Sequence, residues 1–301
     1  MKKPIALLLV LALLLSISAC ASNAPAKGAL TITDMTGREI KLDKPAEKIV
    51  AITAADCEIL YALGAGNTVV GRGEYCDYPA EVESVPSVQS GSDTNIEQIV
   101  ALKPDVVIMS TMAQTEEQIA SLENAGIQVV VSEAKTINDV YTAITLIGTV
   151  AGKNDEAKTI IGTMKKAFED IKARVQSDGT KTVYFEISPL EYGLWASGTG
   201  TFMDEIGIML GLSNIFADFE SWAQVSEEQV IQRNPDYIIT TTMSFEGSQD
   251  PVDEVMGRQG WGDTTAIKNG SVYNADSDAI TRPGPRLADA AKELYDFVYG
   301  G

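Results

Sequence analysis

Short apolar runs alternate with amphipathic stretches along most of the chain. The runs are rich in valine and isoleucine and are bounded by glycine, proline or aspartate, which predicts buried strands. The stretches between them place apolar residues three and four positions apart, which predicts helices. The predicted strands are 49–53, 69–71, 106–109 and 128–131, and the predicted helices are 57–63, 95–102 and 116–124. This alternation indicates an α/β fold with mainly parallel sheets covered by helices.

The segment before the first of these strands has a different pattern. Residues 30–33 and 39–42 flank the sequence Asp34-Met35-Thr36-Gly37. A polar turn closed by glycine between two β-rich runs predicts a β-hairpin.

One stretch of the sequence occurs twice. Residues 97–108 (EQIVALKPDVVI) align without gaps on residues 228–239 (EQVIQRNPDYII), 131 positions later. Each copy predicts a helix that a proline ends, followed by a buried strand. Two copies about half a chain apart indicate two related lobes, although a generic helix–turn–strand unit also produces such similarity.

A long amphipathic stretch separates the two copies. Apolar residues recur at three- and four-residue steps from Ile160 to Val175, and they predict a helix over 155–177 with Asn154 as its N-cap. A helix of that length extends about 35 Å, enough to cross from one lobe to the other. The alternative is a helix packed on a single lobe.

Composition removes several function classes. The chain has 301 residues, 42 acidic against 23 basic side chains and a net charge of −19, so it lacks the basic surface that nucleic acids require. It contains no histidine, which excludes a Ser-His-Asp triad and histidine-ligated zinc or haem. Its hydrophobic content of 45% is typical of a folded globular protein.

The N-terminus has the pattern of an export signal. Two lysines precede an apolar run from Ile5 to Ile17, which is too short to span a bilayer comfortably. The run ends in Ile17-Ser18-Ala19-Cys20, which resembles the lipobox of bacterial lipoproteins. We therefore expect a signal peptide over 1–19, lipidation at Cys20, and a tether over 20–28 that anchors an extracytoplasmic domain to the cell membrane.

Four further motifs, in their order along the chain, resemble one family. They are residues 74–79 (EYCDYP), 95–99 (NIEQI) with the following Pro104-Asp105, 221–230 (SWAQVSEEQV) and 282–286 (RPGPR). Together with the lipobox they are similar to the solute-binding proteins of ABC importers for cobalamin, ferric siderophores and haem. The resemblance covers residues 29–301.

The resemblance implies a fold and a set of partners. It implies two Rossmann-like α/β lobes with mainly parallel sheets, over 29–152 and 179–301, joined by a single long linking helix within 153–178. It also implies a ligand in the cleft between the lobes, small lobe closure, and delivery to an ABC permease and ATPase complex. A monomer with no resident cofactor is expected.

Two glutamates are expected to dock to that permease. In the family one glutamate on each lobe contacts arginines of the permease, and the matching positions here are Glu97 and Glu228. The internal repeat pairs the same two residues, and two equivalent acids suit a two-fold symmetric basic partner. The alternative is that both are acids favoured at helix N-termini.

Loops at the carboxyl ends of the strands are expected to line the cleft. These loops contain Asp56, Arg72, Glu74, Tyr75, Met112, Gln114, Glu186, Tyr192, Trp195 and Arg282. Tyr75, Met112, Tyr192, Trp195, Trp222 and Arg282 are the candidate ligand-binding residues. The aromatic side chains suit a flat ligand, and Arg282 suits a ligand carboxylate or phosphate.

The class of ligand remains open at this stage. Two tryptophans that line the corrin pocket of cobalamin binders have no counterpart here, where Gln89-Ser90-Gly91 and Ser110-Thr111-Met112 stand instead. A corrinoid, a ferric siderophore and a haem-like chelate all remain, as does a metal-free solute or an oxyanion. An extracellular enzyme on a chelatase-like two-lobed scaffold is the alternative function, although no nucleophile elbow or Walker loop is present.

Cys57 and Cys76 have three possible roles. In the family fold, the loops that carry them border the cleft on the same lobe. A disulfide, thiolate ligation of a soft metal and two buried free thiols are the hypotheses.

Overall fold

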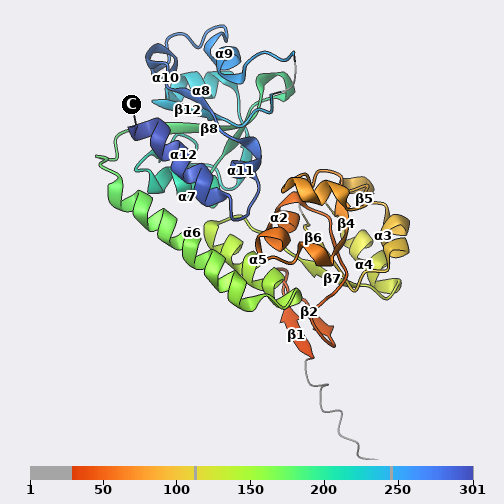
Figure 1. Ribbon diagram of the computed structural model, residues 1–301. Helices are drawn as coiled ribbons and strands as arrows, with labels where there is room; N and C mark the ends of the chain where they lie inside the picture. The colour runs from red at the N-terminus through yellow and green to blue at the C-terminus, as the bar shows by residue number, and fades with distance from the viewer. Residues whose placement is uncertain (1–28, 112–113, 245–246, 301) are drawn as a thin grey trace, which may run out of the picture.

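The described residues form two lobes with one main sheet each, and a separate two-stranded hairpin lies beside the N-terminal lobe (Figure 1). The computed structural model describes residues 29–111, 114–244 and 247–300. The expected signal peptide, Cys20 and Met112 lie outside these residues. No helix in the described part of the chain is long and apolar enough to cross a membrane.

The N-terminal lobe is built on a fully parallel sheet. Its strand order is β5-β4-β3-β6-β7, and a separate antiparallel hairpin, β1 with β2, precedes it. The strands are β1 (Leu30–Thr33), β2 (Glu39–Leu42), β3 (Ile49–Ala51), β4 (Val69–Gly73), β5 (Ser87–Val88), β6 (Val106–Met109) and β7 (Gln128–Val131). The helices are α2 (Ala54–Ala62), α3 (Ile96–Leu102), α4 (Glu116–Asn124) and α5 (Ile137–Val150).

The C-terminal lobe has a mixed sheet. The order is β11-β9-β8-β12-β13, with β10 also paired to β8. At one edge, β9 runs antiparallel to both of its neighbours, β8 and β11. Its strands are β8 (Thr182–Ser188), β9 (Trp195–Ser197), β10 (Ser213–Asn214), β11 (Trp222–Gln224), β12 (Tyr237–Thr240) and β13 (Val272–Asn274). Its helices are α7 (Phe202–Met209), α8 (Glu227–Arg233), α9 (Pro251–Met256), α10 (Thr265–Asn269), α11 (Ser277–Thr281) and α12 (Leu287–Tyr299).

The long helix α6 (Asn154–Arg174) joins the lobes, and Figure 1 shows it running along both of them. It packs against α5 of the N-terminal lobe and against α7 and α12 of the C-terminal lobe. Its buried Met164, Phe168 and Ile171 belong to a hydrophobic core that contains residues of both lobes. The apolar face of α6 therefore links the two lobes through a shared core, and each lobe also has a core cluster of its own.

The ends of α6 differ from the sequence prediction. Lys153, not Asn154, is the N-cap, and its side chain makes no capping hydrogen bond. The helix ends at Arg174, where the chain becomes extended at Val175. The Arg174 guanidinium lies 4.3 Å from the centre of the Tyr295 ring, so a contact with α12 fixes this end of the helix.

The two copies of the repeat are equivalent in three dimensions. Helices α3 and α8 each lead, through a left-handed residue, into the central strands β6 and β12 (φ 51° at Lys103 and 47° at Asn234). In each lobe the following aspartate accepts backbone hydrogen bonds at the start of the neighbouring strand: Asp105 from Lys48 and Asp236 from Thr182, both at 2.9 Å. The repeat therefore marks the same structural unit in both lobes.

Candidate functional site

A cavity of about 210 Å³ lies between the lobes at the carboxyl ends of the N-terminal strands. The N-terminal lobe contributes small and polar side chains that follow β3, β6 and β7, and the C-terminal lobe contributes the segment after α11. The lining residues are Thr53, Ala54, Ala55, Asp56, Ser110, Ser132, Ala134, Thr281, Arg282 and Pro283. This is the edge of the sheet where ligands bind in open α/β folds.

Asp56 is the titratable group on the N-terminal wall of this cavity. It stands in the first turn of α2, where the Thr53 hydroxyl accepts from the Asp56 backbone N–H at 3.3 Å and donates to the Asp56 carboxylate. The side chain is only 2% exposed. Burial raises the pKa of Asp56 to about 6, against the hydrogen bonds from Thr53 and Ser132 that lower it.

A larger cavity of about 680 Å³ lies on the C-terminal lobe, beside the ends of β8 and β12. Tyr192 is in its wall, with Leu190, Thr242 and Met243. Tyr192 and Met243 are 76% and 55% exposed. Exposed side chains of this size next to a cavity are typical of a ligand site.

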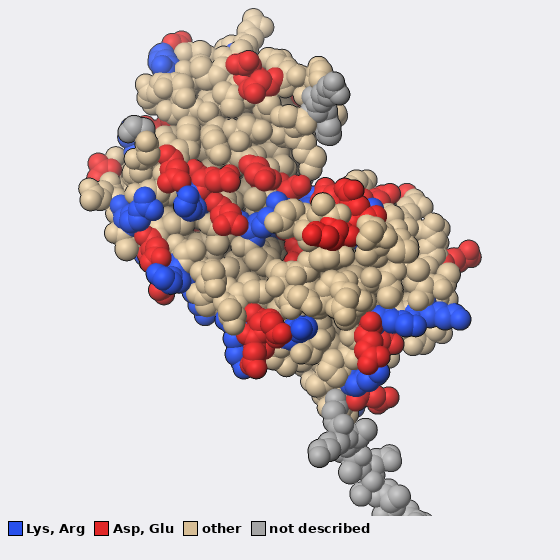
Figure 2. Space-filling model, viewed as in Figure 1, with Lys and Arg blue, Asp and Glu red and all other residues tan. Residues whose placement is uncertain are grey.

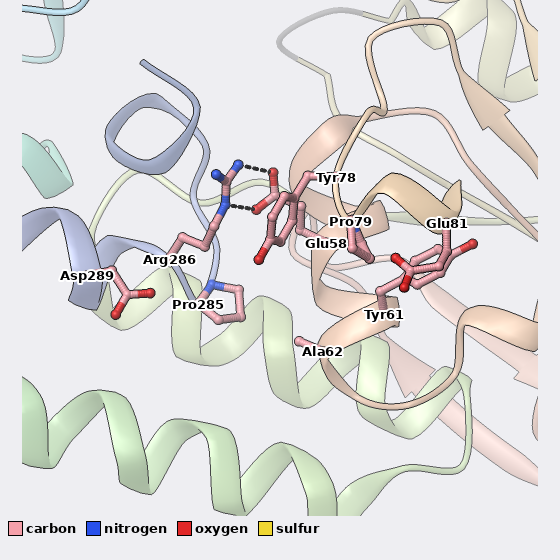
Figure 3. Close-up of a pocket in the computed structure, with 9 residues that line it drawn as sticks. All are labelled: Glu58, Tyr61, Ala62, Tyr78, Pro79, Glu81, Pro285, Arg286 and Asp289. Atoms are coloured by element: carbon pink, nitrogen blue, oxygen red, sulfur yellow. Dashed lines mark hydrogen bonds and ion pairs between the residues drawn. The ribbon is translucent and has the colours of Figure 1, made fainter. Parts of the chain in front are cut away.

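An inter-lobe ion cluster joins the two lobes. We use this term for Glu58 and Asp77 of the N-terminal lobe with Asp278, Arg282 and Arg286 of the C-terminal lobe. The Glu58 carboxylate is 3% exposed and accepts from Arg282 at 2.9 Å and from Arg286 at 2.6 and 2.8 Å. Figure 3 shows the Arg286 guanidinium facing Glu58, with the Tyr78 ring beside them.

The ion cluster stands between two cavities. Arg282 borders the 210 Å³ cavity, whereas Glu58 and Arg286 border another of about 530 Å³, drawn in Figure 3, whose walls include Tyr61 and Tyr78. Acidic side chains gather along the junction between the lobes, with basic ones beside them (Figure 2).

Arg282 has a different environment from the one predicted. It was expected to pair with a ligand carboxylate or phosphate, but its partners are the carboxylates of Glu58, Asp77 and Asp278, at 2.6 to 2.9 Å. Its hydrogen bonds hold the pKa of Asp77 below the usual range. Arg282 still lines the inter-lobe cavity, but its charge is matched within the protein.

The predicted aromatic residues lie in different surroundings. Tyr75 follows β4 and is 70% exposed, and Trp195 on β9 is 40% exposed. Trp222 is half-buried on β11 and packs edge-on against Phe202, with ring centres 5.6 Å apart. Of these four residues, Tyr192 lines the larger cavity, and none lines the cavity between the lobes.

Several other polar side chains near the strand ends form hydrogen bonds within the protein. Arg72 donates to the Cys76 carbonyl oxygen at 2.9 Å and shapes the loop after β4. Gln114 accepts from the Ser110 backbone N–H at 2.9 Å. Glu186 is fully buried and accepts from Arg258 at 2.6 and 2.8 Å. These side chains were expected to line the cleft, and their hydrogen bonds instead hold the backbone or another buried charge.

Glu97 and Glu228 occupy equivalent places in the first turns of α3 and α8. Both are exposed, and neither makes an ion pair with another described residue. The neighbouring Glu227 differs, because it accepts from the Trp261 indole N–H at 2.8 Å. Hydrogen bonds from its own backbone and from Ser226 lower the pKa of Glu228. Each lobe thus presents, at the same position of the repeat, one exposed carboxylate that has no ion-pair partner among the described residues.

Cys57 and Cys76 are both buried and free. Of the three hypotheses for them, the structure shows two thiols with no bond between them. Both sulfur atoms lie 3.8 Å from the carbonyl oxygen of Ala51, so the fold brings the two thiols close together.

Glu58 is the residue of this site that sequence reasoning missed. The signal was present, since a glutamate between the apolar residues Cys57 and Ile59 of a predicted helix needs a partner for its charge. Its partners, Arg282 and Arg286, lie more than 220 positions away. No local pattern connects them.

Comparison with known proteins assigns this architecture. The sequence profile of a family described as periplasmic binding protein matches residues 49–279, which include strands of both lobes. The chain belongs to this family. The family members compared below are named as substrate-binding or solute-binding proteins, not as enzymes.

Individual members are similar over most of their length. A lipoprotein of Bacillus subtilis described as an uncharacterized ABC transporter substrate-binding lipoprotein is 34% identical over 276 residues, covering 90% of this chain and 85% of its own. A vitamin B12-binding protein of Vibrio cholerae superposes with a TM-score of 0.71 at 26% identity, over 84% of this chain and 97% of that one. A possible iron-binding protein of Staphylococcus epidermidis gives 0.70 at 29% identity, over 85% and 100%.

Proposed function

We propose that this protein is an extracytoplasmic substrate-binding lipoprotein that captures a metal chelate between its lobes and delivers it to an ABC importer. The observation that carries this proposal is the pair of cavities at the carboxyl ends of the strands, one at the lobe junction and one on the C-terminal lobe, in a chain of the periplasmic binding protein family. The lipobox at Cys20 and the relative named as a lipoprotein support a membrane anchor.

Exposed aromatic side chains favour a chelate with a broad apolar face. Tyr192 lines the larger cavity, and Tyr75 and Trp195 line neither cavity at the strand ends but also have large exposed fractions. Such rings pack well on flat ligands. Two of the named relatives are a vitamin B12-binding protein and a possible iron-binding protein, which supports a corrinoid or an iron chelate such as a ferric siderophore or a haem-like ligand.

Charge argues against an oxyanion as the ligand. The arginines nearest the lobe junction, Arg282 and Arg286, are already paired with carboxylates of the protein. A small anion in the 210 Å³ cavity would also meet the buried Asp56. A neutral or cationic chelate avoids both penalties.

Delivery is proposed to use Glu97 and Glu228. Because the repeat places one unpaired carboxylate on each lobe, the pair suits a permease that presents two basic patches related by a two-fold axis. Exchange of ligand between a monomeric binding protein and the permease needs no covalent step.

Spectroscopy and titration test the ligand. The mature domain, purified from its native host, is examined for visible absorbance and then titrated with cyanocobalamin, haemin and a ferric trihydroxamate while tryptophan fluorescence is followed. We expect saturable quenching by one of these three and weaker binding of that ligand by Tyr192→Ala. Quenching by none of them would contradict the chelate proposal, and chemical conversion of a bound ligand would favour the enzyme alternative.

A second experiment tests delivery separately. Charge reversal at both positions, Glu97→Lys with Glu228→Lys, should abolish uptake in whole cells while the affinity for the ligand stays unchanged. The matched control is Glu116→Lys, at another exposed first-turn glutamate of the N-terminal lobe, which should leave uptake intact. Normal uptake by the double variant would show that these acids do not dock.

A further inference from the structure

Cys57 and Cys76 form a pair of thiols in direct contact. Both side chains have no exposed surface. Both sulfur atoms lie 3.8 Å from the same acceptor, the carbonyl oxygen of Ala51 at the end of β3. The hydrogen bond with Cys76, followed by burial, raises the pKa of the Cys57 thiol well above its usual range. In the folded protein the pair is therefore neutral and shielded from solvent reagents.

The two cysteines occupy positions that matter for the lobe junction. Cys57 stands on α2 immediately before Glu58, and Cys76 stands in the loop after β4 immediately before Asp77. Glu58 and Asp77 are the two N-terminal carboxylates that hold Arg282. The residue before Cys76 is Tyr75, one of the proposed ligand contacts. A bond between the two sulfurs would thus join the two segments that carry the N-terminal half of the ion cluster.

We propose that Cys57 and Cys76 are joined by a disulfide in the exported protein, and that this bond fixes the loop of Tyr75 and Asp77 to helix α2. The inference rests on the extracytoplasmic location in the proposed function, where disulfides persist. Two thiols lose two protons and two electrons as the S–S bond forms. The electrons reduce the disulfide of an extracytoplasmic thiol oxidoreductase to two thiols.

The timing of the reaction follows from burial. With both thiols inaccessible in the folded domain, exchange occurs while the chain folds after export, before the loop closes over α2. Once formed, the disulfide is protected from small reductants by the same burial. Thiolate binding of a soft metal is the weaker hypothesis, since no cluster of three or more histidine, cysteine or acidic side chains able to hold a metal occurs among the described residues.

Peptide mapping tests the bond directly. Exported protein is denatured in guanidinium chloride at mildly alkaline pH with iodoacetamide present and no reductant, so that every free thiol reacts as its thiolate. Digestion then allows Cys57 and Cys76 to be read separately from Cys20. We expect no alkylation at either residue and a linked peptide 2 Da lighter than the sum of its two reduced parts. Alkylation of both residues in protein shown to be outside the cell would overturn the proposal.

A second arm separates this inference from the proposed location. The chain without residues 1–19, made in a reducing cytoplasm and refolded in a glutathione redox buffer, should acquire the same bond. If the refolded chain forms the bond, but the protein of the native host is not exported and keeps free thiols, then the proposed location is wrong and the pairing is right. Free thiols after oxidative refolding would mean that the pairing is wrong.

Thermal unfolding tests what the bond does. The midpoint of the oxidised protein should lie about 5–10 °C above that of the reduced protein, because the bond closes a loop of about 20 residues. The double variant Cys57→Ser with Cys76→Ser is the control, and reductant should leave its midpoint unchanged. Equal midpoints for oxidised and reduced wild type would contradict the anchoring role.

Discussion

Replacing Glu58 by glutamine probes the ion cluster that joins the lobes. The carboxylate accepts three hydrogen bonds from Arg282 and Arg286 while only 3% exposed. The amide of glutamine has the same shape as the Glu58 carboxylate but no charge. It also places an N–H group beside a guanidinium, which has no acceptor for it. Arg282 retains Asp77 and Asp278, whereas Arg286 retains only Asp276 at 3.9 Å.

These contacts set the size of the effect. Hydrogen bonds to charged groups contribute about 1.5–3 kcal/mol each, and removing one member of a buried pair costs about 3–5 kcal/mol. Because Arg282 keeps two carboxylates, we expect the lower end, a loss of about 3 kcal/mol in the free energy of unfolding. Urea unfolding followed by tryptophan fluorescence measures it.

The matched control is Glu81→Gln. Glu81 lies on the wall of the cavity beside Glu58, is exposed and makes no ion pair with the described residues, so its replacement should change stability by less than about 0.5 kcal/mol. In the Glu58→Gln background, Arg286→Gln should cost much less than it does alone. Equal stabilities for Glu58→Gln and Glu81→Gln would refute the view that this cluster holds the lobes together.

Three other predictions follow from buried charge and backbone conformation. Burial raises the pKa of Asp56 from 3.8 to about 6, so the folded state binds the proton more tightly than the unfolded state does. Relative to Asp56→Asn, the unfolding free energy of wild type should therefore fall by about 2.5 kcal/mol as pH rises from 4 to 7 and change little above pH 7, which urea unfolding at each pH measures. Glu186→Gln leaves Arg258 buried with only Glu254 as a partner, and should lower the unfolding free energy by about 3 kcal/mol without changing ligand affinity. Lys103→Gly should raise the thermal midpoint, because lysine is strained at a φ of 51°, whereas the equivalent Asn234→Gly should not, because asparagine tolerates that conformation.

The elements that could be predicted from the sequence were those with a clear local pattern of apolar residues. Strand β7 and helix α4 have the bounds that their apolar spacing predicted, and the repeat located equivalent units in both lobes. No element was predicted over Ile137–Val150, yet it forms α5. Its many β-branched residues obscure the helical period, and packing against α6 decides its conformation.

The candidate site was less predictable because its contacts join distant segments. Arg282 was expected to face a ligand in the cleft, and in the structure it borders the inter-lobe cavity with carboxylate partners from α2, the loop after β4 and α11. The antiparallel strands β9 and β11, which carry Trp195 and Trp222, likewise depend on pairing across about 25 intervening residues. Contacts between distant segments decide whether an arginine faces a ligand or a carboxylate of the protein. The spacing of residues along the chain does not predict these contacts.

Three sets of contacts between the lobes limit the motion that remains. Helix α6 joins them along one side through a continuous core, and the ion cluster joins them near the cavities. The start of α7 joins them again: the Phe202 N–H donates to the Lys135 carbonyl oxygen, and the Glu205 carboxylate accepts from the Ile137 N–H, both at 2.6 Å. Bodies held at three separate places cannot turn about one axis unless one set of contacts breaks. In the proposed delivery step, a permease that contacts Glu97 and Glu228 at once would act on both lobes, and widening the gap between them would require such a break.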